Sequence, residues 1–276
     1  MASPQRRPVF FVSDRTGITA ETLGHSLLTQ FAGVEFEQHS LPFVDSVERA
    51  EQVVAEINRV TEERGVRPLV FSTLIVDELR LTVMQSKGVF FDFFDAFIGP
   101  LEEEFHLQST HTIGLSHGVS DEARYMVRMD AVNFALETDD GISSHRYEYA
   151  DLILAGVSRC GKTPTCLYMA LQFGIFAANY PLTEEDFTSH RLPAELSAFK
   201  HKVFGLTIDA HRLSDIRQER RPHSRYASLE ECRKEVRLAE AMFRNEGVMV
   251  YDTSTSSIEE IATTILQRAR IKRRLY

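Results

Sequence analysis

Short apolar runs alternate with segments of helical periodicity through the N-terminal part of the chain. Strand-like runs occupy residues 9–12, 36–41, 69–71 and 89–91, and amphipathic segments lie between them. Strands that alternate with helical segments favour parallel pairing, because each connection must cross back over the sheet before the next strand begins. The pattern predicts a parallel α/β domain.

The clearest predicted helix of this part follows Asp45. Apolar residues recur on one of its faces, Asp45 and Glu48 have the spacing of a capping box, and Gly65 supplies a C-terminal stop. Gly88 is expected to end a second helix that begins near Asp77. Both helices fit the crossover connections of a parallel sheet.

The same alternation returns in the C-terminal half. Strand-like runs occupy residues 152–155, 175–178, 203–208 and 248–251. A final helix is expected to start at a capping box made by Ser256 and Glu259, and its apolar face should point to the core. The fold class predicted for the whole chain is α/β, with a second parallel sheet in this half.

The pattern loosens between the two halves, which suggests a domain boundary. Glycines and histidines become frequent there, with one helix expected over residues 121–136. The prediction is an N-terminal α/β domain at residues 1–105 for partner docking or regulation, a connecting segment at 106–148, and a kinase-like nucleotide-binding α/β domain at 149–276.

A phosphate-loop motif gives the C-terminal domain its chemistry. GVSRCGKT matches G-x-x-x-x-G-K-[ST] at every fixed position and directly follows an apolar strand-like run. Backbone amides of such a loop surround phosphate oxygens, the lysine neutralises the outermost phosphate, and the hydroxyl can hold Mg²⁺. The predicted nucleotide-binding residues are Gly156, Val157, Ser158, Arg159, Cys160, Gly161, Lys162 and Thr163.

Three aspartates are candidates for chemistry around this loop. Asp139 and Asp140 precede Gly141 in a pattern typical of a simple turn, and they could equally serve catalysis or magnesium binding. Asp209 follows a strand-like run, where phosphate-loop proteins often place a magnesium-organising carboxylate and where strand ends also carry Asp for other reasons. The predicted metal-binding pair is Thr163 with Asp209.

Three further segments each admit a functional and a structural interpretation. Residues 212–225 are rich in arginine, either as a lid that clamps phosphates or as a solvated helix face. Residues 13–21, SDRTGITAE, either cap the first helix or bind an anion or partner at a strand end. The hydroxyl-rich residues 252–262 either cradle a base or only cap the last helix.

Composition excludes several classes of function. The net charge of −9 disfavours a nucleic-acid surface and gives no general attraction to anionic membranes. No apolar stretch approaches the roughly 18 residues of a membrane span, and the N-terminus lacks the hydrophobic segment of a secretory signal. We therefore expect a soluble cytoplasmic protein.

Cysteine and histidine usage indicates no structural metal site. The three cysteines, Cys160, Cys166 and Cys232, lack C-x-x-C spacing and suit a reducing compartment without disulfides. His106, His111 and His117 are not spaced like the histidines of a zinc helix.

Taken together, the motifs resemble one family, the bacterial pyruvate, phosphate dikinase and phosphoenolpyruvate synthase regulatory proteins. The resemblance extends nearly end to end. It rests on FFVSDRTGITAETLG, GVRPLVF, DDGI, GVSRCGKTPTCLYMALQFGIFAANYPL, HKVFGLTID, SRYAS and SIEEIA. The combination of SRCGKTPT, FGLTID and SRYAS is most similar to the phosphoenolpyruvate synthase branch. Ala210 and Thr138 depart from residues common in the family, and neither lies in the phosphate loop.

The resemblance implies a bifunctional enzyme. ADP would donate its terminal phosphoryl group to a threonine of phosphoenolpyruvate synthase and inactivate it, leaving AMP. Inorganic phosphate would then remove that group as diphosphate and restore activity. Mg²⁺ is the expected metal, phosphoenolpyruvate synthase is the expected partner, and a homo-oligomer is compatible with the sequence but not predicted by it.

Residue roles follow from the motif and the resemblance. Lys162 is expected to stabilise charge on the transferred group, and the general base is expected among Asp140, Asp139 and His117, which lie upstream in the family-like segment. Arg217, Arg221 and Arg225 are expected to hold transferred or product phosphate.

Two other functions remain open at the level of sequence. One is a phosphate-loop kinase for a small metabolite, against which the additional N-terminal domain argues. The other is a protein without catalytic activity that senses ADP and inhibits its partner by contact.

Overall fold

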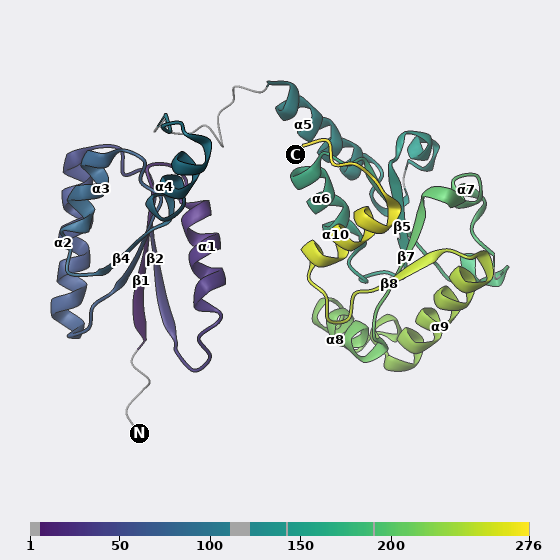
Figure 1. Ribbon diagram of the computed structural model, residues 1–276. Helices are drawn as coiled ribbons and strands as arrows, with labels where there is room; N and C mark the ends of the chain where they lie inside the picture. Colours follow the sequence, from purple (N-terminus) through teal and green to yellow (C-terminus); the bar gives the residue numbers. More distant parts are fainter. Residues whose placement is uncertain (1–5, 111–121, 142, 190, 276) are drawn as a thin grey trace. The chain divides into compact units, whose positions relative to one another are not determined.

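The chain folds into two compact α/β units, residues 1–118 and 119–276. The computed structural model describes residues 6–110, 122–141, 143–189 and 191–275 (Figure 1). The segment expected to connect the domains, 106–148, is thus divided, because its helix packs against the phosphate-loop helix and belongs to the second unit.

The first unit is built on a four-stranded parallel sheet of order β2-β1-β3-β4. Its strands are β1 (Arg7–Val12), β2 (Phe36–Leu41), β3 (Leu69–Ser72) and β4 (Val89–Asp92). Its helices are α1 (Ile18–Leu28), α2 (Val47–Arg64), α3 (Asp77–Met84) and α4 (Phe93–Phe105). The predicted parallel α/β domain is confirmed.

Alternating side chains of β1 supply both cores of this unit. Phe10 and Val12 pack with the buried residues of α2 and α3, whereas Val9 and Phe11 pack with those of α1 on the opposite face. Figure 1 shows α1 across the sheet from α2 and α3. Because β1 is covered on both faces, its continuous apolar run is what a central parallel strand requires.

The predicted N-terminal cap of α2 and the predicted end of α3 are wrong. The cap of α2 is Ser46, which accepts a hydrogen bond from the backbone N–H of Arg49, and not Asp45. Gly65 ends α2 as predicted. The helix from Asp77 already ends at Met84, whereas Gly88 lies before β4 at a close approach, where a Cβ would lie 2.6 Å from Cγ2 of Val70.

The second unit repeats the same strand order with different elements. Its parallel sheet has the order β6-β5-β7-β8. Its strands are β5 (Leu152–Gly156), β6 (Ala177–Pro181), β7 (Val203–Thr207) and β8 (Met249–Asp252). Its helices are α5 (Glu122–Glu137), α6 (Lys162–Phe173), the short α7 (Ala194–Ser197), α8 (Ala210–Arg220), α9 (Leu229–Glu246) and α10 (Ile258–Ala269).

Helix α6 follows the central strand β5 and packs against α5 and α10. It ends at Gly174, as the sequence predicts, in the left-handed conformation at φ 67°. The capping box of α10 is made by Ser257 and Glu260, one residue after the predicted pair. Strand β5 is entirely buried, so the loop that follows it is held by a rigid core.

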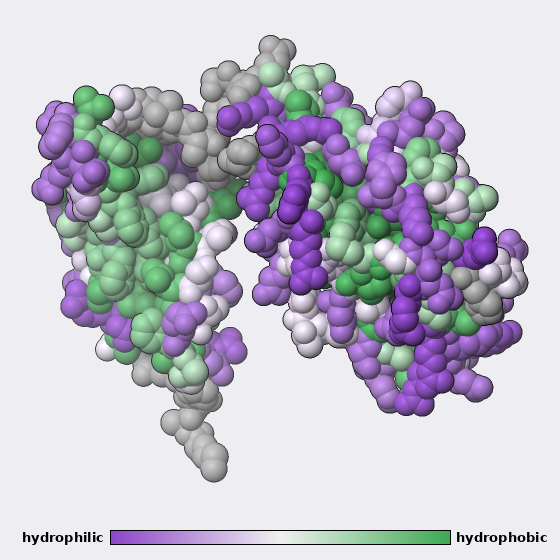
Figure 2. Space-filling model, turned by 45° about the vertical axis from the view of Figure 1, so that its right-hand side comes forward, coloured by the Kyte–Doolittle hydropathy of each residue, from purple (hydrophilic) through white to green (hydrophobic). Residues whose placement is uncertain are grey.

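The two units differ in surface character. Figure 2 shows apolar side chains gathered on the visible face of the first unit and hydrophilic side chains over much of the second. Large apolar side chains are exposed on α1 and α4: Leu23, Leu27, Phe97, Leu101 and Phe105. Within the described parts of the chain, no helix is both long enough and apolar enough to cross a bilayer.

Candidate active site

The phosphate loop connects the buried end of β5 to the first turn of α6. Gly161 caps this helix at φ 94°, a left-handed conformation that glycine adopts without steric cost. Gly156 is required for space, because a Cβ there would lie 2.6 Å from the carbonyl oxygen of Leu206. No side chain caps α6, so its first amides are available to an anion.

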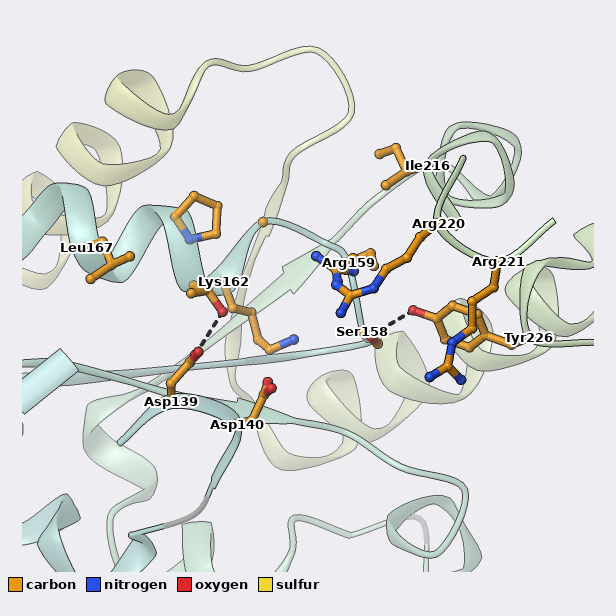
Figure 3. A pocket seen from close by; sticks show the side chains of 13 residues that line it. Asp139, Asp140, Ser158, Arg159, Lys162, Leu167, Ile216, Arg220, Arg221 and Tyr226 are labelled. Carbon is orange, nitrogen blue, oxygen red and sulfur yellow. Dashed lines mark hydrogen bonds between the residues drawn. The ribbon is translucent and has the colours of Figure 1, made fainter. Parts of the chain in front are cut away.

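A cavity of about 730 Å³ opens over this loop (Figure 3). It is lined by Asp139, Asp140, Ser158, Arg159, Gly161, Lys162, Thr163, Pro164, Leu167, Ile216, Arg220, Arg221 and Tyr226. This volume lies in the usual range for small-molecule sites, roughly 300 to 1,000 Å³. The structure therefore places the predicted loop at a cavity large enough for a nucleotide.

Lys162 is held within the loop. Its side chain is buried, and Nζ donates a hydrogen bond to the carbonyl oxygen of Val157 at 2.9 Å. This contact holds the ammonium group beside the backbone amides of the loop, so a phosphate at the loop would contact both the ammonium group and the amides. A buried ammonium facing an anion in low dielectric interacts more strongly than an exposed one.

Asp139 and Thr163 meet at the floor of the cavity. The Thr163 hydroxyl donates to Oδ1 of Asp139 at 2.8 Å (Figure 3). Nδ2 of Asn179, on β6, also donates to Oδ1 of Asp139 and lies 3.1 Å from Oγ1 of Thr163. Oδ1 of Asn179 accepts from the backbone N–H of Asp140 at 3.1 Å. Asn179 thus joins the Asp139–Asp140 turn to the phosphate-loop helix.

Asp140 has a different environment from Asp139. Its backbone is left-handed at φ 52°, and its exposed side chain lines the cavity. Asp139 is half-buried and engaged by two donors, so it is occupied as a hydrogen-bond acceptor. The two carboxylates therefore suit different roles, with Asp140 free to meet a reacting hydroxyl.

Arg217 supports the loop from below and does not line the cavity. Its guanidinium is fully buried and donates to the carbonyl oxygens of Ser158 and Tyr226 and to Glu235, at 2.6 Å from Oε2 of Glu235. It also lies 4.1 Å from the ring centroid of Tyr226. The expected role of Arg217 as a phosphate ligand does not agree with this placement.

Besides Arg159 of the loop, the arginines that line the cavity are Arg220 and Arg221, at the end of α8. Arg221 was predicted from the sequence to hold phosphate, whereas Arg220 was expected only as part of the arginine-rich segment 212–225, for which a lid was one interpretation. Arg225 lies outside the lining and pairs with Glu184 and Glu231 on the surface. Of the three predicted phosphate-binding arginines, only Arg221 therefore reaches the cavity.

Asp209 has a structural role at the start of α8. Its carboxylate accepts hydrogen bonds from the backbone N–H groups of His211 and Arg212, and the Arg212 bond is the main cause of its lowered pKa. It is not among the residues that line the cavity. Asp139 is the carboxylate beside Thr163, so the expected metal pair of Thr163 with Asp209 is not brought together.

His117 lies outside the described residues. The three cysteines are buried and free, and burial raises the pKa of the Cys160 thiol inside the loop. Across the described ranges, no group of three or more His, Cys, Asp or Glu side chains could hold a metal ion.

Sequence reasoning missed three residues that shape this site. Asn179 lies on β6, 16 positions after Thr163. Tyr226 lies in the SRYAS segment, and its hydroxyl is 2.9 Å from Oγ of Ser158 in the loop. The third, Arg220, entered the sequence argument only as one member of the arginine-rich segment 212–225 and was not singled out. A polar residue inside an apolar strand was an available signal for Asn179, because buried amides require partners.

The fold and the site define an α/β protein with a cavity at a phosphate-loop motif, and comparison with known proteins gives its family. Residues 9–266 match the family model described as kinase/pyrophosphorylase. The chain belongs to this family.

Named relatives cover almost the whole chain. A protein of Alkalilimnicola ehrlichii is 55% identical over 98% of each chain. One from Legionella pneumophila strain Corby is 53% identical over 98% of this chain and 100% of its own. One from Pseudomonas aeruginosa strain LESB58 is 51% identical over 98% of each chain. All three bear the name "Putative phosphoenolpyruvate synthase regulatory protein".

Proposed function

We propose that this protein is a bifunctional regulator of phosphoenolpyruvate synthase. In one direction it transfers the terminal phosphoryl group of ADP to a threonine of the synthase, giving phosphothreonine and AMP. In the other, inorganic phosphate attacks the phosphothreonine, giving diphosphate and the free threonine. Family membership and the names of the relatives support the regulatory role and the target.

The observation that carries the proposal is the phosphate loop at the large cavity, with both carboxylates of the Asp139–Asp140 turn beside it. For phosphorylation, Lys162 and the amides from Gly156 to Thr163 would hold the phosphate chain of ADP. Asp140 would accept the proton of the threonine hydroxyl as its oxygen attacks phosphorus. The bond to the AMP oxygen breaks, and AMP leaves.

The reverse activity would use the same anion pocket. Inorganic phosphate in the loop would attack the phosphorus of the phosphothreonine in line, and the threonine oxygen would leave. Asp140, protonated in this direction, would return a proton to that oxygen. Because a loose phosphoryl-transfer transition state is stabilised chiefly by positioning and charge, one cradle could serve both reactions.

Mg²⁺ fits the chemistry of the residues present. The Thr163 hydroxyl and the Asp139 carboxylate offer adjacent oxygen ligands, and Mg²⁺ commonly takes one or two such ligands together with substrate phosphates and waters. When bound, it would neutralise developing charge on the phosphate oxygens. Arg220 and Arg221 would supply further positive charge from the opposite wall of the cavity.

The direct test is to incubate the protein with phosphoenolpyruvate synthase and ADP, and to measure the intact mass of the synthase. The proposal predicts a gain of one phosphoryl group with loss of activity, and reversal of both on addition of phosphate, with diphosphate formed. An unchanged mass with lost activity would instead indicate an ADP-sensing inhibitor. Phosphorylation of a small acid by ATP, with the synthase ignored, would indicate a metabolite kinase.

A further inference from the structure

The loop after β1 in the first unit has the same construction as the phosphate loop after β5. In both sheets this strand is central and its loop precedes the first crossover helix. Residues 13–17 separate Val12 from α1, as residues 157–161 separate Gly156 from α6. Both helices start after a left-handed glycine, Gly17 at φ 80° and Gly161 at φ 94°.

The start of α1 is open to a ligand. No side chain caps this helix of 11 residues, so the first backbone N–H groups lack side-chain acceptors. The loops after β1 and β3 lead into connections on opposite faces of the sheet, and such a divergence forms the crevice in which open α/β sheets bind ligands. A small cavity of about 40 Å³ lies there, lined by residues 13–19 together with Thr73, Ile75 and Phe94.

Thr73 provides independent evidence for a ligand. Its side chain lines the cavity and is only 4% exposed, and its hydroxyl has no hydrogen-bond partner among the residues described here. A hydroxyl that lines a cavity and has no protein partner is available to hydrogen-bond a bound group. Arg15 also lines the cavity, and its guanidinium forms no ion pair within the described ranges.

Two differences from the phosphate loop define the ligand. Ile18 follows Gly17 where Lys162 follows Gly161, so the site lacks the ammonium group that a nucleotide phosphate chain requires. Asp14 lines the cavity and is 6% exposed, with a single long hydrogen bond of 3.4 Å from the backbone N–H of Ile75 within the described chain. The cavity has room for a group of only a few atoms.

A carboxylate beside an anion site selects for a protonated oxyanion. Ionised Asp14 can only accept hydrogen bonds, so an oxyanion that keeps a hydroxyl can donate to it. Inorganic phosphate keeps such a proton at neutral pH, whereas sulfate does not, and a phosphate monoester has lost most of it above its second pKa of about 6.

We propose that the loop 13–19 and Thr73 form a second anion site that binds free inorganic phosphate. The α1 amides, the Thr73 hydroxyl and Arg15 donate to it, and Asp14 accepts its proton. This site is separate from the nucleotide cavity and does not depend on the proposed function. It gives the first unit a means to sense the concentration of phosphate.

Hydrogen–deuterium exchange of the full-length protein, read by peptide, tests this inference. Inorganic phosphate is expected to slow exchange in residues 13–28, both in the native protein and in Lys162→Ala, whereas sulfate at equal ionic strength is not. Thr73→Val should raise the phosphate concentration needed for half-protection about tenfold, as expected for one lost hydrogen bond to a charged group. Asp14→Asn should allow sulfate to protect the same peptide.

Matched variants separate this role from effects on folding. Thr82→Val removes a hydroxyl of α3 that donates to the backbone carbonyl of Glu78, away from the cavity lining, and should leave protection unchanged. Thr73→Ser keeps the hydroxyl and should protect as the native protein does. The proposal is overturned if residues 13–28 ignore phosphate, if sulfate protects equally in the native protein, or if protection disappears in Lys162→Ala.

Discussion

Arg217 and Ser158 are joined by two hydrogen bonds, from Nε and Nη2 of the guanidinium to one carbonyl oxygen of the phosphate loop, at 3.3 and 3.0 Å. The same guanidinium pairs with Glu235 and is fully buried. Arg217 therefore determines the shape of the loop without entering the cavity. It connects the stability of the second unit to the shape of this loop.

Replacement of Arg217 by Ala should destabilise the protein and weaken ADP binding together. Removing one partner of a buried pair leaves Glu235 uncompensated, which typically costs about 3 to 5 kcal/mol. Chemical denaturation and calorimetry with ADP measure the two effects. Arg225→Ala, which removes an exposed arginine of the same segment, should change neither. A stable Arg217→Ala protein with native ADP affinity would contradict this role.

Arg220 and Arg221 should contribute to turnover more than to affinity. Both line the cavity, where their charge can meet the phosphoryl group as it moves. The double Ala variant is expected to lose turnover by on the order of a hundredfold, comparable to the loss of a donor to a transition-state oxyanion. Steady-state assays with phosphoenolpyruvate synthase and calorimetry with ADP separate the effects. If ADP affinity and turnover fall equally, these arginines bind the ground state of the nucleotide and do not act selectively on the transition state.

Asp140→Asn should abolish most phosphorylation while ADP still binds. The amide keeps the shape of the side chain but cannot accept the threonine proton, and general-base catalysis is typically worth about 10²- to 10⁴-fold. Single-turnover transfer from labelled ADP measures the chemical step. If this variant transfers the phosphoryl group at the native rate, another residue acts as the general base.

Asn179→Ala should lower turnover although Asn179 itself is not expected to contact the reacting atoms. Asn179 fixes both the Asp139 carboxylate and the backbone of Asp140, and small displacements of catalytic groups can cost on the order of a hundredfold. The ratio of turnover to ADP affinity is the informative measurement. Asn133→Ala, at an exposed position of α5, is the control and should behave as the native protein does. If Asn179→Ala keeps native turnover, the turn does not need this contact.

The sequence predicts those features that depend on neighbours along the chain. The phosphate loop, its strand and its helix follow from one contiguous motif, and the stops at Gly65 and Gly174 follow from the left-handed conformation that ends a helix. The N-caps of α2 and α10 lie one residue after the predicted ones, because adjacent hydroxyl and acidic residues compete for the same role. Ser257 precedes Ile258 directly, whereas Ser256 stands one position too early.

Features that depend on tertiary contacts were not predictable in this way. Arg217 and Arg221 belong to the same arginine-rich segment, but they lie about one helical turn apart. Arg217 is buried inside α8, whereas Arg221 follows the end of that helix and lines the cavity. Asp209 has the expected place at a strand end, but the adjacent helix uses its carboxylate as a cap. Asp139 reaches Thr163 only because the turn before β5 packs beside β6.

If one phosphate cradle serves both opposing reactions, as proposed, Lys162→Ala should impair both. The measurement is the rate of each reaction by this variant: transfer from ADP to phosphoenolpyruvate synthase, and phosphate-dependent release of diphosphate from the phosphorylated synthase. Both rates should fall together, by a similar factor. Loss of phosphorylation with undiminished diphosphate release would show that the two activities use different sites.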